Sequence, residues 1–310
     1  MFKSVNKISQ TSFILSFLFI IQLTAYPQNP EQSNIIAQKY DEVTLFSTEK
    51  RTIHSEIVND NFEIYISLPY KYPNTDTTYP VLFCLDANIK FGLISTVVNT
   101  QGTLMKEIPE IIVVGIAYPM KGLEDWVIGR NRDLTPTKLP ENEKYWIDRL
   151  SKATGRDDID ISTGHADKFL AFIIKELIPF VESEYRVSND RAIHGSSLGG
   201  LFTLYSLFQY PETFQRYFIG SPSIKWDEDY MYQLENDFAA KHKDLPARLF
   251  MCVGGLESDK YINNMNKMDS LLCSRNYPNL EIESLIFENE THGSTVPAAI
   301  SMGLKMLYDK

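Results

Sequence analysis

Residues 195–199 read GSSLG, a G-x-S-x-G pattern that places a serine on a sharp turn between a strand and a helix. Ser197 is the serine that fits, because Ser196 would need glycine at positions 194 and 198, where the chain has His and Leu. The apolar run RAIH precedes the motif, and the helical pattern LFTLYSLF follows it. We therefore predict that Ser197 is a nucleophile whose flanking glycines let the turn close. The alternative is a structural turn with an unreactive serine.

A serine nucleophile needs a base, and the base needs an acid that orients it. In a site built on this strand–turn–helix motif, the chain order is serine, acid, histidine. Three of the five histidines precede Ser197, and His242 precedes the strand-like run ARLFMCVGG, after which the acid should follow. His292 remains, in the polar turn ENETHGST after the last expected strand. We predict that His292 is the base, and the alternative is an ordinary histidine of a surface loop.

The acid is expected in the loop GGLESD, where the run ARLFMCVGG ends. Glu257 comes first after the two glycines, and we favour it over Asp259. Asp259 could instead cap the helix that follows, because a carboxylate at that position accepts hydrogen bonds from the first helical N–H groups. A further alternative is that both carboxylates are solvated loop side chains.

Acyl transfer also needs N–H donors for the negative oxygen that develops in the transition state. The backbone amide of Leu198, directly after the predicted nucleophile, is one expected donor. Asp86, Ala87 and Asn88 follow the expected strand at 81–85, and we choose the Asn88 amide as the second donor. Asp86 or Asn88 could also cap a helix there, and the two interpretations are compatible.

Strands and helices alternate along the chain, which indicates a mostly parallel central sheet with helices on both faces. The carboxyl ends of such strands form the edge where ligand sites gather. An antiparallel start is expected at 42–50, 52–59 and 61–70. Further strands are expected at 79–86, 111–118, 191–194, 217–221, 247–254 and 281–287, and helices at 91–105, 141–153, 166–185, 197–210, 228–242, 259–275 and 294–307.

The composition excludes several classes of protein. The 310 residues are 44% hydrophobic and 23% charged, which is typical of a globular chain and not of a disordered one. A net charge of −10 argues against a nucleic-acid binder, which needs a basic surface. Three Cys are too few for a disulfide scaffold, and Cys84 and Cys252 are expected to be buried free thiols. Cys273 is expected on a helix, no Cys–His spacing suggests a metal site, and no cofactor is expected.

The first residues have the layout of a secretory signal peptide. Lys3 and Lys7 precede the apolar run FILSFLFIIQL, and the small Ala25 precedes a polar stretch. We predict a signal peptide at 1–25, a polar lead-in at 26–40, and one α/β domain at 41–310. Cleavage would remove two lysines and no acid, which changes the net charge from −10 to −12. The alternative is an uncleaved N-terminal anchor, although the run is shorter than the roughly 20 apolar residues of a membrane span.

The chain resembles the putative-esterase family of α/β-hydrolases over roughly residues 50–310. That family includes enterobactin-type siderophore esterases, feruloyl and acetyl-sugar esterases, S-formylglutathione hydrolases and mycolyltransferases, and the siderophore-esterase branch is the most similar. The resemblance implies an α/β-hydrolase fold, with Ser197 as nucleophile, His292 as base, Glu257 as acid, and the Leu-Asp-x-Asn segment and Leu198 as oxyanion hole. It rests on the segments YPVLFCLDAN, IIVVGIAY, RNRDLTPT, TGHADKFLAFIIKELIPFVESEYR, HGSSLGGLFTLYSLFQYPETFQRYFIGSPSIKW, VGGLES and THGS.

Three positions depart from the pattern of that family. Ala87 stands where glycine is usual, Ser196 stands where histidine is common, and His165 stands where glycine is common. None of these departures removes a predicted catalytic group. We expect Ala87 to narrow the oxyanion loop, and Ser196 and His165 to alter the acyl pocket.

Substrate contacts are expected from the long polar segment 118–163, which follows a central strand. Arg130 and Arg132 could clamp a carboxylate, a catecholate or a sugar hydroxyl, or they could form Arg–Asp pairs that fix the loop. Trp226 could stack on an aromatic or sugar ring, as could Trp126 and Trp146, or these rings could pack the loops.

These observations predict an exported, periplasmic or secreted, serine carboxylic-ester hydrolase that needs no cofactor. Its expected substrate is a small-molecule or saccharide ester, of the siderophore, sugar or aryl type. Neither nucleic acid nor a membrane span is expected for the mature chain. Two alternatives use the same features: a hydrolase-fold binding protein without turnover, and an acyltransferase that passes the acyl group to an acceptor other than water.

Overall fold

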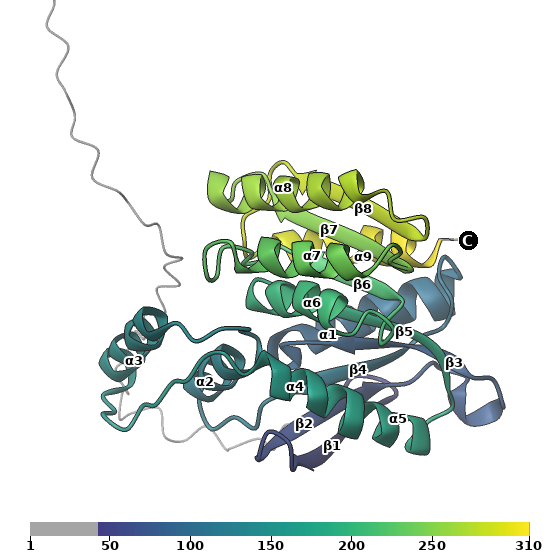
Figure 1. Ribbon diagram of the computed structural model, residues 1–310. Coiled ribbons are helices and arrows are strands. Elements are labelled where there is room, and N and C mark those ends of the chain that lie inside the picture. The colour runs from purple at the N-terminus through teal and green to yellow at the C-terminus, as the bar shows by residue number, and fades with distance from the viewer. Residues whose placement is uncertain (1–42, 310) are drawn as a thin grey trace, which may run out of the picture. The chain divides into compact units, whose positions relative to one another are not determined.

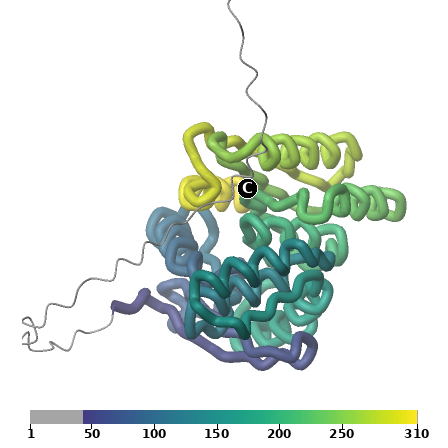
Figure 2. The backbone as a smooth tube through the Cα atoms, turned by 90° about the vertical axis from the view of Figure 1, so that its left-hand side faces the viewer, coloured from purple at the N-terminus to yellow at the C-terminus, as the bar shows by residue number. Residues whose placement is uncertain are grey.

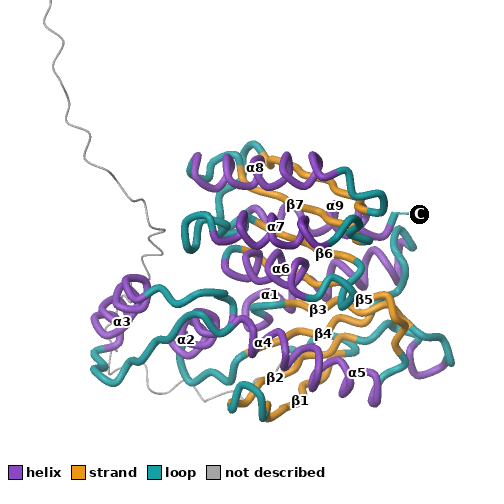
Figure 3. Tube along the Cα trace, viewed as in Figure 1, coloured by secondary structure: helices purple, strands orange, loops and turns teal. Residues whose placement is uncertain are grey.

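In the computed structural model, which describes residues 43–309, eight strands form one sheet in the order β1-β2-β4-β3-β5-β6-β7-β8 (Figures 1 and 3). The strands β1, β2 and β4 pair antiparallel, and all pairings from β4 through β3 to β8 are parallel. Residues 44–310 form one compact unit, and the predicted signal peptide and lead-in lie outside the described residues. The strands are β1 (Thr48–Ser55), β2 (Asp60–Ser67), β3 (Tyr79–Cys84), β4 (Ile112–Ala117), β5 (Val187–Ser196), β6 (Arg216–Gly220), β7 (Ala247–Gly254) and β8 (Leu280–Phe287).

Helices cover both faces of the sheet, as the sequence pattern predicts. Figure 1 shows α6, α7 and α8 in front of the strands, and α1 and α9 behind them. No helix among the described residues is both long and apolar enough to cross a membrane. The helices are α1 (Ala87–Val98), α2 (Leu123–Asp133), α3 (Pro140–Thr154), α4 (Ala166–Phe172), α5 (Ile178–Glu184), α6 (Leu198–Gln209), α7 (Tyr230–Lys241), α8 (Asp259–Arg275) and α9 (Thr295–Tyr308).

The core consists of two apolar clusters, one on each face of the sheet. Along β3, Val81 and Phe83 belong to one cluster, and Leu82 and Cys84 belong to the other. Successive side chains of a strand point to opposite faces, so a strand covered on both sides is apolar throughout. Cys252 is also buried and unpaired, which confirms the prediction that it and Cys84 are core thiols.

The antiparallel start differs from the prediction. Three strands were expected between residues 42 and 70, but the structure has two, and β1 runs through the expected break at residue 51. The turn instead lies at residues 56–59, where Asn59 has a φ of 59°. Asparagine tolerates this left-handed conformation, which the alternation of apolar and polar residues does not reveal.

The polar segment after β4 contains a helix that the sequence did not predict. Helix α2 carries few apolar residues, so it lacks a clear helical stripe. It packs through Gly129, where a Cβ would lie 2.4 Å from the ring of Tyr118. The expected helix at 141–153 is present as α3, and a small cluster that includes Val127, Ile159 and Ile161 joins this segment together. Figure 2 shows α2 and α3 in the foreground, on the side that is left in Figure 1.

Candidate active site

The predicted catalytic side chains follow three parallel strands at the same edge of the sheet. Ser197 follows β5, Glu257 lies just beyond β7, and His292 lies between β8 and α9. Parallel strands end at one edge, so residues about 60 and 35 positions apart in the chain are brought to one side of the molecule. This edge is where open α/β sheets bind their ligands.

Ser197 occupies a strained turn between β5 and α6. Its φ of 58° and ψ of −120° lie outside the regions that side-chain-bearing residues ordinarily adopt. Its N–H donates to the carbonyl oxygen of Gly220 at 2.9 Å, which ties the turn to the end of β6. Helix α6 is buried from Leu198 to Phe208, so the turn rests on a rigid core element. Ser197 itself is partly exposed, whereas the residues on either side are buried.

The two glycines of the motif have unequal roles in this turn. A Cβ at Gly195 would lie 2.1 Å from the carbonyl oxygen of Gly199, a distance no side chain can take up. A Cβ at Gly199 would meet Asp86 Oδ2 at 3.4 Å, which is ordinary contact. The steric need for glycine is therefore strongest at position 195.

Glu257 holds one nitrogen of His292. Its Oε2 lies 2.6 Å from His292 Nδ1, and the Glu257 side chain is 1% exposed while the His292 side chain is 21% exposed. An ionised carboxylate only accepts hydrogen bonds, so the Nδ1 atom carries the proton. That tautomer places the ring lone pair on Nε2, the atom a general base would use.

The other oxygen of Glu257 is also fixed. Oε1 accepts hydrogen bonds from Ser221 Oγ at 2.5 Å and from the N–H of Gly254 at 2.8 Å. Burial by itself raises the pKa of Glu257, but the hydrogen bonds from His292, Ser221 and Gly254 hold that pKa below its usual value. Glu257 is therefore an ionised, rigidly held partner of His292. Asp259, by contrast, is exposed in the first turn of α8, next to the N-cap Ser258.

A chain of contacts links His292 to the turn of Ser197. The Tyr261 ring lies 4.9 Å from the His292 ring, and the Tyr261 hydroxyl lies 3.3 Å from Ser223 Oγ. The N–H of Ser223 donates to the carbonyl oxygen of Ser197 at 3.1 Å. The sequence did not predict site positions for Ser221, Ser223 or Tyr261. A usable signal was present, because the segment 221–223 directly follows β6 at the same edge.

The two predicted oxyanion donors both lie at helix starts. Leu198 is the first residue of α6, and Asn88 is the second residue of α1. The first N–H groups of a helix have no partner within the helix, and they favour a negative charge. The Asn88 side chain binds the backbone of Tyr118 in both directions, at 2.8 and 2.9 Å. The start of α1 is thereby fixed to the end of β4.

The predicted substrate residues all have partners within the chain. Arg130 pairs with the buried Asp86, with Nε 3.0 Å from Oδ1, and its guanidinium lies over the Trp126 ring. Arg132 binds Asp133 at 2.7 Å and Asp60 at 2.6 Å. Trp226 donates from its ring nitrogen to the carbonyl oxygen of residue 137 at 3.2 Å. These contacts match the structural alternative, and a role in substrate binding stays a prediction.

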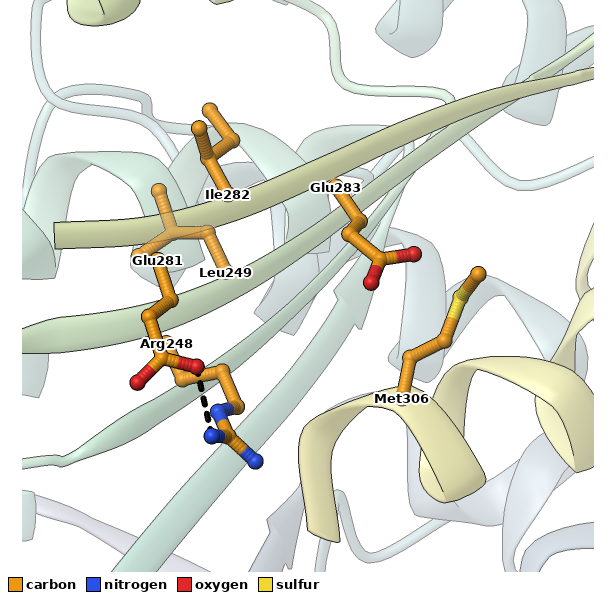
Figure 4. Close-up of a pocket in the computed structure, with 6 residues that line it drawn as sticks. All are labelled: Arg248, Leu249, Glu281, Ile282, Glu283 and Met306. Atoms are coloured by element: carbon orange, nitrogen blue, oxygen red, sulfur yellow. Dashed lines mark ion pairs between the residues drawn. The ribbon is translucent and has the colours of Figure 1, made fainter. Parts of the chain in front are cut away.

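One pocket lies away from this edge. It is lined at the beginnings of β7 and β8, where Arg248 and Glu281 form an ion pair (Figure 4). The catalytic candidates follow the opposite ends of these strands. Among residues 43–309, no three His, Cys, Asp or Glu side chains are grouped so that they could hold a metal ion.

A mostly parallel sheet covered on both faces, with a serine on a strained strand-to-helix turn, defines an α/β-hydrolase. Residues 55–154 and 152–283 match the sequence model of the family described as "Putative esterase", and the chain belongs to that family. It is therefore a carboxylic ester hydrolase.

Named relatives share most of the length of the chain. The ferri-bacillibactin esterase BesA of Bacillus subtilis (strain 168) is 32% identical over 276 residues, covering 84% of this chain and 90% of that protein. The siderophore triacetylfusarinine C esterase of Aspergillus fumigatus is 26% identical, covering 81% of this chain and 91% of that protein. The crystal structure of the BES protein from Bacillus cereus superimposes with a TM-score of 0.74 at 28% identity, covering 87% and 98% of the two chains.

Proposed function

We propose that this esterase uses Ser197 as its nucleophile, His292 as general base and acid, and Glu257 as the orienting acid. The observation that carries the proposal is the 2.6 Å contact between Glu257 Oε2 and His292 Nδ1, at the strand edge that also bears Ser197. Asp259, the alternative acid, is exposed on α8.

We propose that the reaction proceeds through these residues in two stages. Ser197 Oγ attacks the ester carbonyl carbon while His292 Nε2 takes the hydroxyl proton, and the N–H groups of Leu198 and Asn88 stabilise the oxyanion. The C–O bond then breaks, the imidazolium gives its proton to the leaving alcohol, and an acyl-serine remains. His292 then takes a proton from water as the water oxygen attacks the acyl carbon, the bond between that carbon and Ser197 Oγ breaks, and the imidazolium returns its proton to Ser197 Oγ as the acid leaves. Glu257 stays ionised throughout and stabilises the imidazolium.

We propose a siderophore-type ester as the substrate class. Two relatives that match this chain over nine tenths of their own length are named as a ferri-bacillibactin esterase and a siderophore triacetylfusarinine C esterase. Aryl and sugar esters are the competing substrates that the sequence suggested. The proposed catalytic domain is residues 41–310, and the proposed location is outside the cytoplasm, in a periplasm or beyond the cell, after cleavage of residues 1–25.

A fluorophosphonate probe tests the nucleophile, because it phosphonylates only activated serines. We expect labelling of wild-type protein at Ser197, confirmed by peptide mass spectrometry, and loss of both labelling and ester hydrolysis in Ser197→Ala. Ser274→Ala, which removes an exposed hydroxyl on α8, is the matched control and should retain both. Hydrolysis that survives in Ser197→Ala would contradict the proposal.

A panel of siderophore trilactones, feruloyl esters, acetyl sugars and short aryl esters tests the substrate. We expect the highest kcat/KM for the siderophore lactone. A higher value for another class of ester would contradict this proposal and make that class the substrate. Product analysis with an added alcohol or sugar acceptor separates hydrolysis from acyl transfer. The mass of the exported protein tests cleavage, because a chain that still contains residues 1–25 would indicate an anchor.

A further inference from the structure

Lys90 is an unusual residue for its place in the fold. It is the fourth residue of α1, its side chain is only 14% exposed, and it lies near the positive end of the helix dipole. A buried cation there is disfavoured by both burial and the dipole. Burial lowers the pKa of Lys90, the Asp86 carboxylate counteracts that effect, and Arg130 adds to it. Neither burial nor the helix dipole therefore gives a reason for a lysine at this position.

The partner of Lys90 is the residue before the proposed nucleophile. Its Nζ donates a hydrogen bond to Ser196 Oγ, and it lies 4.0 Å from Asp86 Oδ2. Asp86 already binds Arg130 through both oxygens and accepts from Trp126 at 2.9 Å. The charge of Asp86 is therefore compensated without Lys90. The specific contribution of Lys90 is therefore its hydrogen bond to Ser196.

Three side chains at the start of α1 fix it to three different elements. Asp86 binds α2 through Arg130, and Asn88 binds the residue after β4. Lys90 binds the end of β5, one residue before the turn of Ser197. The first two contacts hold α1 to its surroundings. The contact made by Lys90 fixes the position of α1 relative to the turn that carries Ser197.

This contact bears on the oxyanion hole, because the two proposed donors belong to separate helices. The Asn88 amide is in the first turn of α1, and the Leu198 amide is at the start of α6. Both amides must lie about 2.7–3.1 Å from one developing oxygen for full stabilisation. A small shift of one helix start against the other would lengthen one of these hydrogen bonds.

Resting on the function proposed above, we propose that Lys90 is a positioning residue that fixes the Asn88 amide relative to the Leu198 amide through its hydrogen bond to Ser196. Lys90 acts through Ser196 and takes no part in proton transfer. The lysine and the serine work as a unit, so either substitution alone should have nearly the effect of both together.

The test compares Lys90→Met, Lys90→Arg, Ser196→Ala and the double variant Lys90→Met/Ser196→Ala on a short aryl ester. Methionine keeps the length of the side chain without a donor, and arginine keeps both the donor and the charge. We expect kcat to fall about 10- to 100-fold in Lys90→Met and in Ser196→Ala, with KM changed less than about threefold, because positioning acts in the transition state. Lys90→Arg should recover at least part of kcat.

A second readout separates positioning from a general loss of structure. The Ki of an aryl boronic acid, which mimics the tetrahedral intermediate, should rise by about the factor by which kcat falls. Unchanged kcat in Lys90→Met, or effects of the two substitutions that multiply in the double variant, would overturn the inference. If Lys90→Met does not fold, Ser196→Ala decides the question by the same two measurements.

The Ser197→Ala variant distinguishes a failure of the positioning role of Lys90 from a failure of the proposed catalytic function. If Ser197→Ala is inactive while both Lys90→Met and Ser196→Ala keep full kcat, only the positioning role fails. If Ser197→Ala stays active, or if the probe labels Ser196, the proposed function fails and the inference fails with it.

Discussion

At the residue scale, the Glu257 carboxylate determines which ring nitrogen of His292 carries the proton. Glu257 is buried, ionised and held by Ser221 and Gly254, and it faces His292 Nδ1 at 2.6 Å. Its placement comes from Ser221, which follows β6, and from Gly254, the last residue of β7, and not from its own loop alone. The sequence predicted Glu257 and His292 from their order after successive strands. The strand order also marked the loop that contains Ser221, but nothing in the sequence indicated that Ser221 contacts Glu257 and so joins two loops.

We predict that Glu257→Gln lowers kcat by about 10²- to 10⁴-fold, because a neutral amide no longer fixes the tautomer or stabilises the imidazolium. KM should change little. Asp259→Asn is the matched control, since it makes the same chemical change on an exposed side chain two residues away, and it should stay within about twofold of wild type. Steady-state kinetics on an aryl ester measures both. A larger loss in Asp259→Asn than in Glu257→Gln would reverse the assignment of the acid.

At the scale of elements, the turn from β5 to α6 depends on the close approach of two backbone segments. The motif and its strand–helix context are local, and the sequence identified them. The break at residue 51 and the absence of α2 were wrong expectations, because both depend on features without a periodic apolar signal. Asn59 makes a left-handed turn, and α2 is fixed by Gly129 against Tyr118 and by the pairing of Arg130 with Asp86.

We predict that Gly195→Ala destabilises the fold by at least about 2 kcal/mol, because its Cβ would meet the carbonyl oxygen of Gly199 at 2.1 Å. Ester hydrolysis should fall by at least about 100-fold, since the turn of Ser197 must shift. Gly92→Ala in α1 is the control: its Cβ would have one neighbour, at 3.7 Å, and should stabilise the helix by about 0.5–1 kcal/mol. Urea unfolding measures both changes, and a stable, active Gly195→Ala would refute the steric explanation.

At the scale of the whole molecule, the fold buries a histidine that the proposed chemistry does not use. His194 lies within β5, packs edge-on against Phe218 at 4.8 Å, and its Nε2 has no hydrogen-bond partner among the described residues. Burial, aided by the charge of Lys90, lowers the pKa of His194 to about 3. The imidazole is therefore neutral in the folded protein at ordinary pH.

We predict that this histidine makes the protein less stable in acid. Its pKa is lower in the folded state than the value of about 6.5 expected in the unfolded chain, so the unfolded chain binds more protons as the pH falls. The stability from neutral His194 is present above pH 6.5 and is lost as the pH falls toward 3. Between pH 7 and pH 5 the loss is about 2 kcal/mol.

Urea unfolding of wild type and His194→Gln at both pH values measures this difference. The substitution itself also changes the free energy of unfolding. That change is taken to be the same at both pH values, so it cancels when each protein is compared with itself at pH 7 and pH 5. We expect the difference between pH 7 and pH 5 to be about 2 kcal/mol smaller in His194→Gln. An equal pH dependence in the two proteins would exclude His194 as its source.

The sequence by itself determined the alternation of strands and helices, the turn at Ser197, and the chain order of serine, acid and histidine. The first two features are local in the chain. The third can be read from the sequence because parallel strands end at one edge of the sheet, so residues that follow successive strands lie close together in space. Only the tertiary structure decided which of Glu257 and Asp259 faces His292, that Ser221 holds Glu257, that Arg130 binds Asp86, and that Lys90 reaches Ser196. Those contacts join residues far apart in the chain, and strand order and helix packing set them, so no spacing or periodicity in the sequence could reveal them.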